Sequence, residues 1–182
     1  IKLRLHPGNN VGMYENKKRA IEYASNDWCI LFDSDNVLTS EYVDAFYSCN
    51  LTPAGNYTPN SNFIFCPSFA KPQFDYRDIA AWNYNTLEVQ KNLSNNVFEC
   101  CLNTCNYIVN RNSYLRVWEP MEMIGAADSI YFMYLWLKSN KAFHIVPGME
   151  YEHRVHEGSG FLENVNQNMK QAKLVKQLIM SL

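Results

Sequence analysis

Apolar and polar positions along the 182-residue chain switch repeatedly between the spacing of two typical of strands and the spacing of three to four typical of helices. Strands are predicted at 1–6, 28–32, 62–69, 106–109 and 142–146, and helices at 14–25, 41–49, 127–137 and 163–182. Because strands and helices alternate, we expect an α/β fold with a helix-covered sheet. No repeat, low-complexity tract or linker interrupts the pattern, so 1–182 is expected to be one domain.

Three segments of this pattern carry more specific expectations. The strand 28–32 is apolar on both faces, which predicts a place in the middle of a covered sheet. Ser40 is predicted to cap the helix that follows it. The segment 70–96 is polar and irregular, and a long loop of this kind inside a compact domain is usually functional.

Composition and charge narrow the classes of partner. The chain is 47% hydrophobic and 19% charged, with a formal net charge of -2. It therefore offers no basic field for nucleic acid or an anionic membrane. It has no apolar run of the roughly 20 residues that a membrane span needs, and 1–6 do not resemble a signal peptide. Aromatic residues make up 14%, which suits flat, hydroxyl-rich ligands such as sugars.

The six cysteines show no regular disulfide framework. Cys29 and Cys66 lie in apolar strands, where a reduced, buried thiol is usual, and we expect a reducing, cytoplasmic setting. Cys100, Cys101 and Cys105 resemble half of a zinc site, but no second pair accompanies them. The glycosylation patterns at Asn50 and Asn92 are expected by chance in a chain so rich in asparagine.

Asp33 and Asp35 directly follow the apolar strand 28–32 in the run ILFDSDNVLT. Strand side chains alternate between faces, so these two carboxylates are expected on the same side. Two adjacent negative charges repel unless a cation or a shared proton lies between them. The pair therefore either holds a metal ion or consists of a nucleophile and its acid.

The second alternative corresponds to the haloacid-dehalogenase-type phosphatases, whose Asp-x-Asp-x-Thr/Val signature Asp33 to Val37 resembles. Asp33 would then attack phosphorus while Asp35 acts as acid and base. That reaction also needs a downstream lysine and a paired acidic site for magnesium. The stretch GAAD, which ends at Asp128, supplies a single carboxylate.

The first alternative is supported by a wider resemblance. The stretch NNVGMYENKKRAIEYASNDWCILFDSDN resembles the donor half of family 2-like nucleotide-sugar glycosyltransferases of the GT-A fold. CLNTCNYIVNRNSYLRV resembles the strand behind the acceptor site of that family, and GAADSIYFMYLWLKSNKAFHIVP resembles its acidic residue at the start of a helix. EYEHRVHEGSG resembles a late histidine segment that returns to the metal.

This resemblance implies a metal-dependent transferase that moves a hexose from a nucleotide diphosphate sugar, by analogy a UDP-sugar, to a hydroxyl acceptor. It implies a GT-A, Rossmann-like mixed sheet, with 1–69 as the donor and metal half and 70–182 as the acceptor half and final helix. The donor would be bound by Asn10, Gly12, Lys17, Asp33, Ser34 and Asp35.

The remaining implied roles concern the cation, the base and the acceptor. Asp35, Asp33, His153 and, as second choice, His156 would hold Mn²⁺ or Mg²⁺. Asp128 would deprotonate the acceptor. The acceptor would be bound by Trp82, Tyr84, Asn106 and Arg111.

The chain also departs from the pattern of the family. Relatives begin with a strand, a helix and a strand ahead of the Asn-x-Gly turn, whereas here only IKLRLH precedes it. The resemblance therefore implies either that an N-terminal portion is missing or that the nucleotide pocket is unusual. Asn36 stands at an often acidic position, and Lys17-Lys18 where Arg-Asn is common. A binding module that has lost its base remains a third interpretation.

Overall fold

A computed structural model describes residues 11–56, 58–103, 106–121, 127–154 and 165–182. The predicted strand at 1–6, the ligand candidates Asn10 and His156, and Cys105 lie outside the described residues. The described helices are α1 Met13–Tyr23, α2 Ser40–Cys49, α3 Thr86–Asn92, α4 Asn96–Leu102, α5 Arg111–Val117, α6 Asp128–Lys138 and α8 Val165–Met180, with a 3₁₀ turn at Arg77–Ile79. The strands are β1 Trp28–Leu31, β2 Val37–Leu38, β3 Phe63–Lys71, β4 Phe74–Asp75, β5 Asn83–Tyr84, β6 Tyr107–Asn110 and β7 Ala142–Glu152.

The described strands form a seven-stranded mixed sheet in the order β1-β6-β3-β7-β2, with β4 paired to β3 and β5 paired to β7. β3 and β7 run parallel, and the other strand pairs are antiparallel. The predicted α/β class is therefore confirmed, as a mixed sheet flanked by helices.

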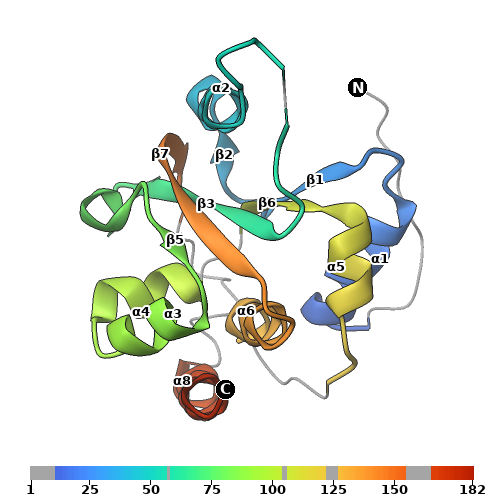
Figure 1. Ribbon diagram of the computed structural model, residues 1–182. Coiled ribbons are helices and arrows are strands. Elements are labelled where there is room, and N and C mark those ends of the chain that lie inside the picture. The colour runs from blue at the N-terminus through green and yellow to red at the C-terminus, as the bar shows by residue number, and fades with distance from the viewer. Residues whose placement is uncertain (1–10, 57, 104–105, 122–126, 155–164) are drawn as a thin grey trace.

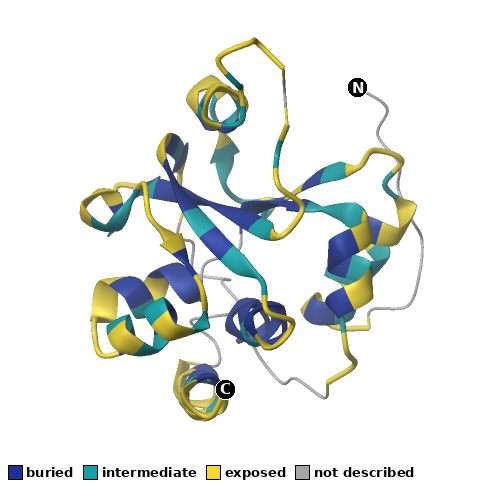
Figure 2. Ribbon diagram, in the orientation of Figure 1, coloured by how far each residue is buried: buried dark blue, intermediate teal, exposed yellow. Residues whose placement is uncertain are grey.

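The helices divide unequally between the two faces of the sheet (Figure 1). α2 packs over one face, where Tyr42 and Phe46 meet Phe65, Val146 and Tyr151. The other described helices lie against the opposite face and enclose the larger apolar cluster. The central strand β3 and the helix α6 are deeply buried (Figure 2), since each buries most of the side chains along its length.

Short polar side chains begin several of these helices. Asn85, Asn95 and Asn110 accept hydrogen bonds from backbone N–H groups in the first turns of α3, α4 and α5. For α2 the capping residue is Thr39, whose side chain accepts from the N–H of Tyr42. The prediction that Ser40 caps α2 is wrong, because Ser40 is already the first helical residue.

Two predictions about strands also need correction. Among the described strands, β1 stands at the end of the strand order instead of the middle, and its Ile30 is 40% exposed. The last strand does not stop at Pro147-Gly148 but continues to Glu152. Gly148 adopts a positive φ of 77°, and the register between β3 and β7 shifts there, so the chain passes through an irregularity and stays paired.

The segment 70–96 is more regular than its polarity suggested. It contains β4, the 3₁₀ turn, β5 and α3. Its buried anchors are Tyr76, Tyr84, Val89 and Leu93, which pack into the larger cluster. Because each regular piece is only a few residues long, no periodicity could emerge from the sequence. Among the helices of the described residues, none has the length and apolar character needed to cross a membrane.

Candidate functional site

The Asp33–Asn36 turn joins β1 to β2 at one end of the sheet. The N–H of Asn36 donates to the carbonyl oxygen of Asp33 at 3.2 Å, which closes the turn. The side-chain oxygen of Asn36 accepts from the N–H of Arg154 at 3.0 Å, just after β7. Asp33 and Asp35 are half-buried, whereas Ser34 is exposed. The turn is thereby fastened to a segment that lies more than a hundred residues away in the chain.

Asn106 holds Asp33 in place from the start of β6. Its Oδ1 accepts the N–H of Asp33 at 2.7 Å, and its Nδ2 donates to Asp33 Oδ2 at 3.3 Å. Nδ2 also donates to the hydroxyl of Tyr151 at 3.1 Å. Asn106 is buried and has a φ of 73°, a conformation that asparagine tolerates better than most residues.

These bonds use both amide hydrogens of Asn106, so its predicted role in binding acceptor hydroxyls does not match this geometry. Its contacts are those of a positioning residue for Asp33. Tyr42 strengthens the arrangement by donating its hydroxyl hydrogen to the carbonyl oxygen of Asn106 at 2.6 Å. The ring of Phe32 packs against both Tyr42 and Tyr151, with centroids 5.9 and 5.4 Å away.

An ion pair lies near the Asp33 carboxyl group that Asn106 holds. Lys17 Nζ, from α1, contacts Asp128 Oδ2, from the first residue of α6, at 2.7 Å. The Asp128 side chain is only 3% exposed. An aspartate in the first turn of a helix is favoured by the helix dipole, and the lysine compensates a charge that burial would otherwise penalise.

The pKa of Asp33 is shifted by burial and by the charged and polar groups around it. Burial raises the pKa of this carboxyl above its usual value, since burial disfavours a charge. The positive charge of Lys17 and the hydrogen bond from Asn106 act in the opposite direction, while the negative charges of Asp128 and Asp35 raise the pKa further. Five polar groups from four distant segments therefore share one electrostatic environment.

His153 follows β7 at the same end of the sheet. Its backbone N–H donates to the carbonyl oxygen of Lys71 at 2.7 Å, and its ring packs edge-on against Phe74 at 5.2 Å. Burial lowers the pKa of His153, and the charges of Asp35 and Asp33 raise it in part. Its Nδ1 is buried without a hydrogen-bond partner among the described residues. A neutral imidazole with a free nitrogen therefore lies within the electrostatic reach of the aspartate pair.

Within the described ranges, no three side chains of histidine, cysteine, aspartate or glutamate are grouped closely enough to hold a metal ion. Among the described residues, no disulfide is formed by Cys29, Cys49, Cys66, Cys100 or Cys101. A cation at Asp33 and Asp35 would therefore need further oxygen ligands beyond those that the described side chains supply.

Gly12 precedes α1 with a φ of 87°, and its carbonyl oxygen accepts the N–H of Asn16 at 3.0 Å. The positive φ explains why glycine suits this turn. A cavity of about 90 Å³ opens beside it, bordered by Tyr14 and Trp118. This space is smaller than the several hundred cubic ångströms usual for small-molecule sites. This cavity beside Gly12 is therefore too small for a nucleotide sugar.

Three of the predicted acceptor residues, Tyr84, Arg111 and Trp82, lie away from the aspartate pair. Tyr84 is buried, donates its hydroxyl hydrogen to the carbonyl oxygen of Ile79 and stacks on Phe143, so it packs in the core. Arg111 donates to the carbonyl oxygens of Ile21 and Glu22 at the end of α1. Neither arrangement leaves the predicted group directed at a ligand.

Trp82 is 67% exposed, but it lies near the opposite end of the sheet. Its neighbour Asn83 pairs with His144. The partner of His144 on β3 is Phe65, whereas the partner of Glu152 is Lys71. Phe65 and Lys71 are six positions apart on β3, about 20 Å at the usual rise of a strand. Trp82 therefore lies about that far from the end of the sheet that carries Asp33 and Asp35.

Sequence reasoning missed Tyr42 and Tyr151, which support Asn106, and it missed the pairing of Lys17 with Asp128. The tyrosines belong to apolar stripes that look like ordinary core positions. The only available signal was Asn106 itself, a polar residue directly before an apolar strand. Comparison with protein-family models, with curated proteins and with solved structures finds no match for this chain.

Proposed function

We propose that this chain is a metal-dependent glycosyltransferase that moves a hexose from a nucleotide diphosphate sugar, a UDP-sugar by our inference, to a hydroxyl group of a glycan or another acceptor. The observation that carries the proposal is the convergence at one sheet end of Asp33, Asp35, His153 and the Lys17–Asp128 ion pair. These groups come from the segments whose resemblance to GT-A glycosyltransferases suggested the function, and they are spread over 137 positions of the chain.

The chemistry of the reaction explains why such a set of groups is useful. When the sugar leaves a nucleotide diphosphate, negative charge develops on the departing pyrophosphate, and groups that stabilise this charge lower the barrier. Lys17 supplies a positive charge that is already oriented within the site by Asp128. A bound Mn²⁺ or Mg²⁺ would neutralise the remaining charge of the leaving group.

The donor set fits such an ion in its chemistry. Carboxylate oxygens suit both Mg²⁺ and Mn²⁺, and an imidazole nitrogen favours Mn²⁺. His153 has an unpartnered buried Nδ1, and its lowered pKa keeps the imidazole in the neutral form that metal ligation requires. Asp35 and His153 would hold the ion, with phosphate oxygens of the donor as further ligands. Asp33, held by Asn106, would bind the ribose or an ion-bound water.

Asp128 is the proposed base, and its ion pair suggests how its action depends on the donor. In the structure Lys17 covers Asp128, so an acceptor hydroxyl has no access to Oδ2. A diphosphate entering beside Asp33 attracts the same ammonium group. We infer that the donor draws Lys17 away from Asp128, which frees the carboxylate to accept the hydroxyl proton. Donor binding would thus precede activation of the acceptor.

A phosphatase with Asp33 as nucleophile is the second candidate, because the positive charge of Lys17 acts on Asp33, although Lys17 precedes Asp33 in the chain and is not the downstream lysine of that family. That reaction also needs a second acidic pair for magnesium, which the sequence lacks at the stretch ending in Asp128. The first proposal accounts for His153 as well, and we prefer it for that reason.

Calorimetric titration with UDP separates the two candidates. We expect UDP to bind in the presence of Mn²⁺ and to bind at least tenfold more weakly without it. Asp35→Ala should abolish the Mn²⁺-dependent increase in UDP affinity, whereas Asp44→Ala, at an exposed aspartate of α2, should leave it unchanged. Metal-independent binding of UDP, together with Asp33-dependent release of phosphate from p-nitrophenyl phosphate, would instead establish the phosphatase.

A further inference from the structure

A second cavity lies near the opposite end of the sheet, on the face that carries α2. Its volume is about 320 Å³, at the lower limit of the 300–1,000 Å³ usual for ligand sites. It is bounded by the end of α2, the loop that follows, and strands β3, β5 and β7. None of the groups assigned to the proposed transferase site lines it.

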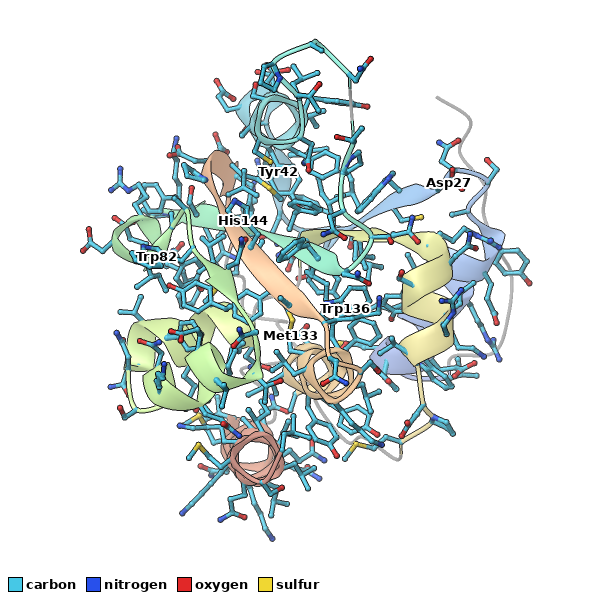
Figure 3. All side chains as sticks on the ribbon, viewed as in Figure 1. Asp27, Tyr42, Trp82, Met133, Trp136 and His144 are labelled. Atoms are coloured by element: carbon cyan, nitrogen blue, oxygen red, sulfur yellow. The ribbon has the colours of Figure 1, made fainter. Side chains whose placement is uncertain are left out.

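Aromatic rings and an imidazole form the floor. Phe63 and Phe65 lie two residues apart on β3 and so face the same side of the sheet, with ring centroids 6.2 Å apart. His144 is the cross-strand partner of Phe65, and its ring meets that of Phe65 edge-on at 6.3 Å. Asn83 Oδ1 lies 2.8 Å from His144 Nδ1, which fixes both side chains. The labelled Trp82 and His144 mark this region in Figure 3.

Amide and hydroxyl groups form the rim, and local hydrogen bonds hold them in place. Asn50 Nδ2 donates to the carbonyl oxygen of Phe46 at the end of α2, at 2.8 Å. The N–H of Thr58 donates to the carbonyl oxygen of Asn50 at 3.0 Å. Asn60 Oδ1 accepts the N–H of Asn62 at 2.9 Å. The rim is therefore preformed to a large extent, which lowers the entropic cost of binding a ligand.

The lining has no formal charge. Among the described residues that border the cavity, there is no aspartate, glutamate, lysine or arginine. Burial lowers the pKa of His144, so its imidazole is neutral at pH 7. A phosphate or carboxylate ligand would find no charged partner in this lining, which argues against nucleotides and acidic peptides.

We propose that this cavity is a binding site for an uncharged saccharide. Sugar hydroxyls both donate and accept hydrogen bonds, and side-chain amides and threonine hydroxyls offer both roles. The C–H faces of a sugar ring pack well against aromatic surfaces such as Phe63. A volume of about 320 Å³ suits one or two sugar rings. The site is separated from Asp35 by most of the sheet, so it does not depend on the proposed transferase activity.

The test is a titration of the isotopically labelled protein with maltohexaose, cellohexaose and chitohexaose, followed by NMR. We expect at least one of them to bind saturably and to shift the resonances of Asn83 and His144. Asn83→Ala, in the floor of the cavity, should weaken that binding at least tenfold, and so should Asn60→Ala, at an exposed rim position. Asn96→Ala, at an exposed asparagine of α4 outside the cavity, should leave binding within twofold.

Asp35→Ala distinguishes this site from the proposed transferase site, because it should abolish metal-dependent binding of UDP and leave oligosaccharide binding unchanged. The proposal is overturned if none of the three oligosaccharides binds saturably, or if the shifted resonances cluster at Asp33 and Asp35. Binding that survives both Asn83→Ala and Asn60→Ala in folded protein also overturns it. Unfolding temperatures of the variants establish that they are folded.

Discussion

Asp33 carries its carboxyl group in surroundings that disfavour a negative charge. It is half-buried, and both Asp35 and Asp128 add negative potential. Two hydrogen bonds with Asn106 and the charge of Lys17 compensate in part. A residue that costs stability in this way is typical of a site arranged for binding a cation or phosphate groups.

Asp33→Asn should therefore stabilise the protein at neutral pH. The pKa of Asp33 is higher in the folded state than the 3.8 expected for the unfolded chain. Above both pKa values the carboxylate destabilises the folded state, and the amide removes that penalty. As the pH falls below 3.8, the carboxyl becomes protonated in both states and the advantage of the variant disappears.

Thermal unfolding of the parent and Asp33→Asn across this pH range checks the prediction. Asp44→Asn, at an exposed position of α2, serves as the control and should change little. A variant that is less stable than the parent at pH 7, or a gain that persists undiminished in acid, would contradict the explanation.

At the scale of elements, the N-terminus of α2 is stabilised by its capping residue, Thr39. Thr39 accepts a hydrogen bond from the N–H of Tyr42 and donates its hydroxyl hydrogen to the carbonyl oxygen of Glu150 at 2.7 Å. Thr39→Ala should thus lower the free energy of unfolding by about 1–2 kcal/mol. Ser40→Ala should change it by less than about 0.5 kcal/mol, because Ser40 is exposed. Urea titrations measure both, and equal effects would refute the assignment of the cap.

The adjacent positions of Thr39 and Ser40 illustrate what periodicity reveals about the elements. Strong apolar patterns predicted β1, β3, α1, α2, α6 and α8 to within a few residues. The cap was missed because serine and threonine are both good caps and the sequence does not show where the first helical residue lies. The short strands β2, β4 and β5 span two residues each, too few to produce a pattern.

The same limit applies to the candidate site. The aspartate pair was visible because two adjacent carboxylates after an apolar strand are unusual. The contact between Lys17 and Asp128 spans 111 positions, so its existence depends on how α1 and α6 pack and not on any local pattern. The acceptor role of Tyr84 is implied only by the resemblance, whereas its ring packs in the core against Phe143.

At the scale of the whole molecule, the sheet separates two chemically different regions. One end gathers the charged groups Asp33, Asp35, Lys17 and Asp128 together with His153. Toward the other end, about 20 Å away along β3, is the uncharged cavity bordered by Asn83 and His144. This division agrees with a protein that handles a charged sugar donor at one place and a neutral saccharide at another.

The central claim is that a divalent cation and a sugar nucleotide meet at the aspartate pair. Substoichiometric Mn²⁺, added with UDP to isotopically labelled protein, broadens the NMR signals of nearby nuclei. We predict the strongest broadening at Asp33 to Asn36 and at His153, weaker broadening at His144, and its loss in Asp35→Ala. Broadening centred elsewhere, or broadening at this turn that Asp35→Ala leaves unchanged, would contradict the claim.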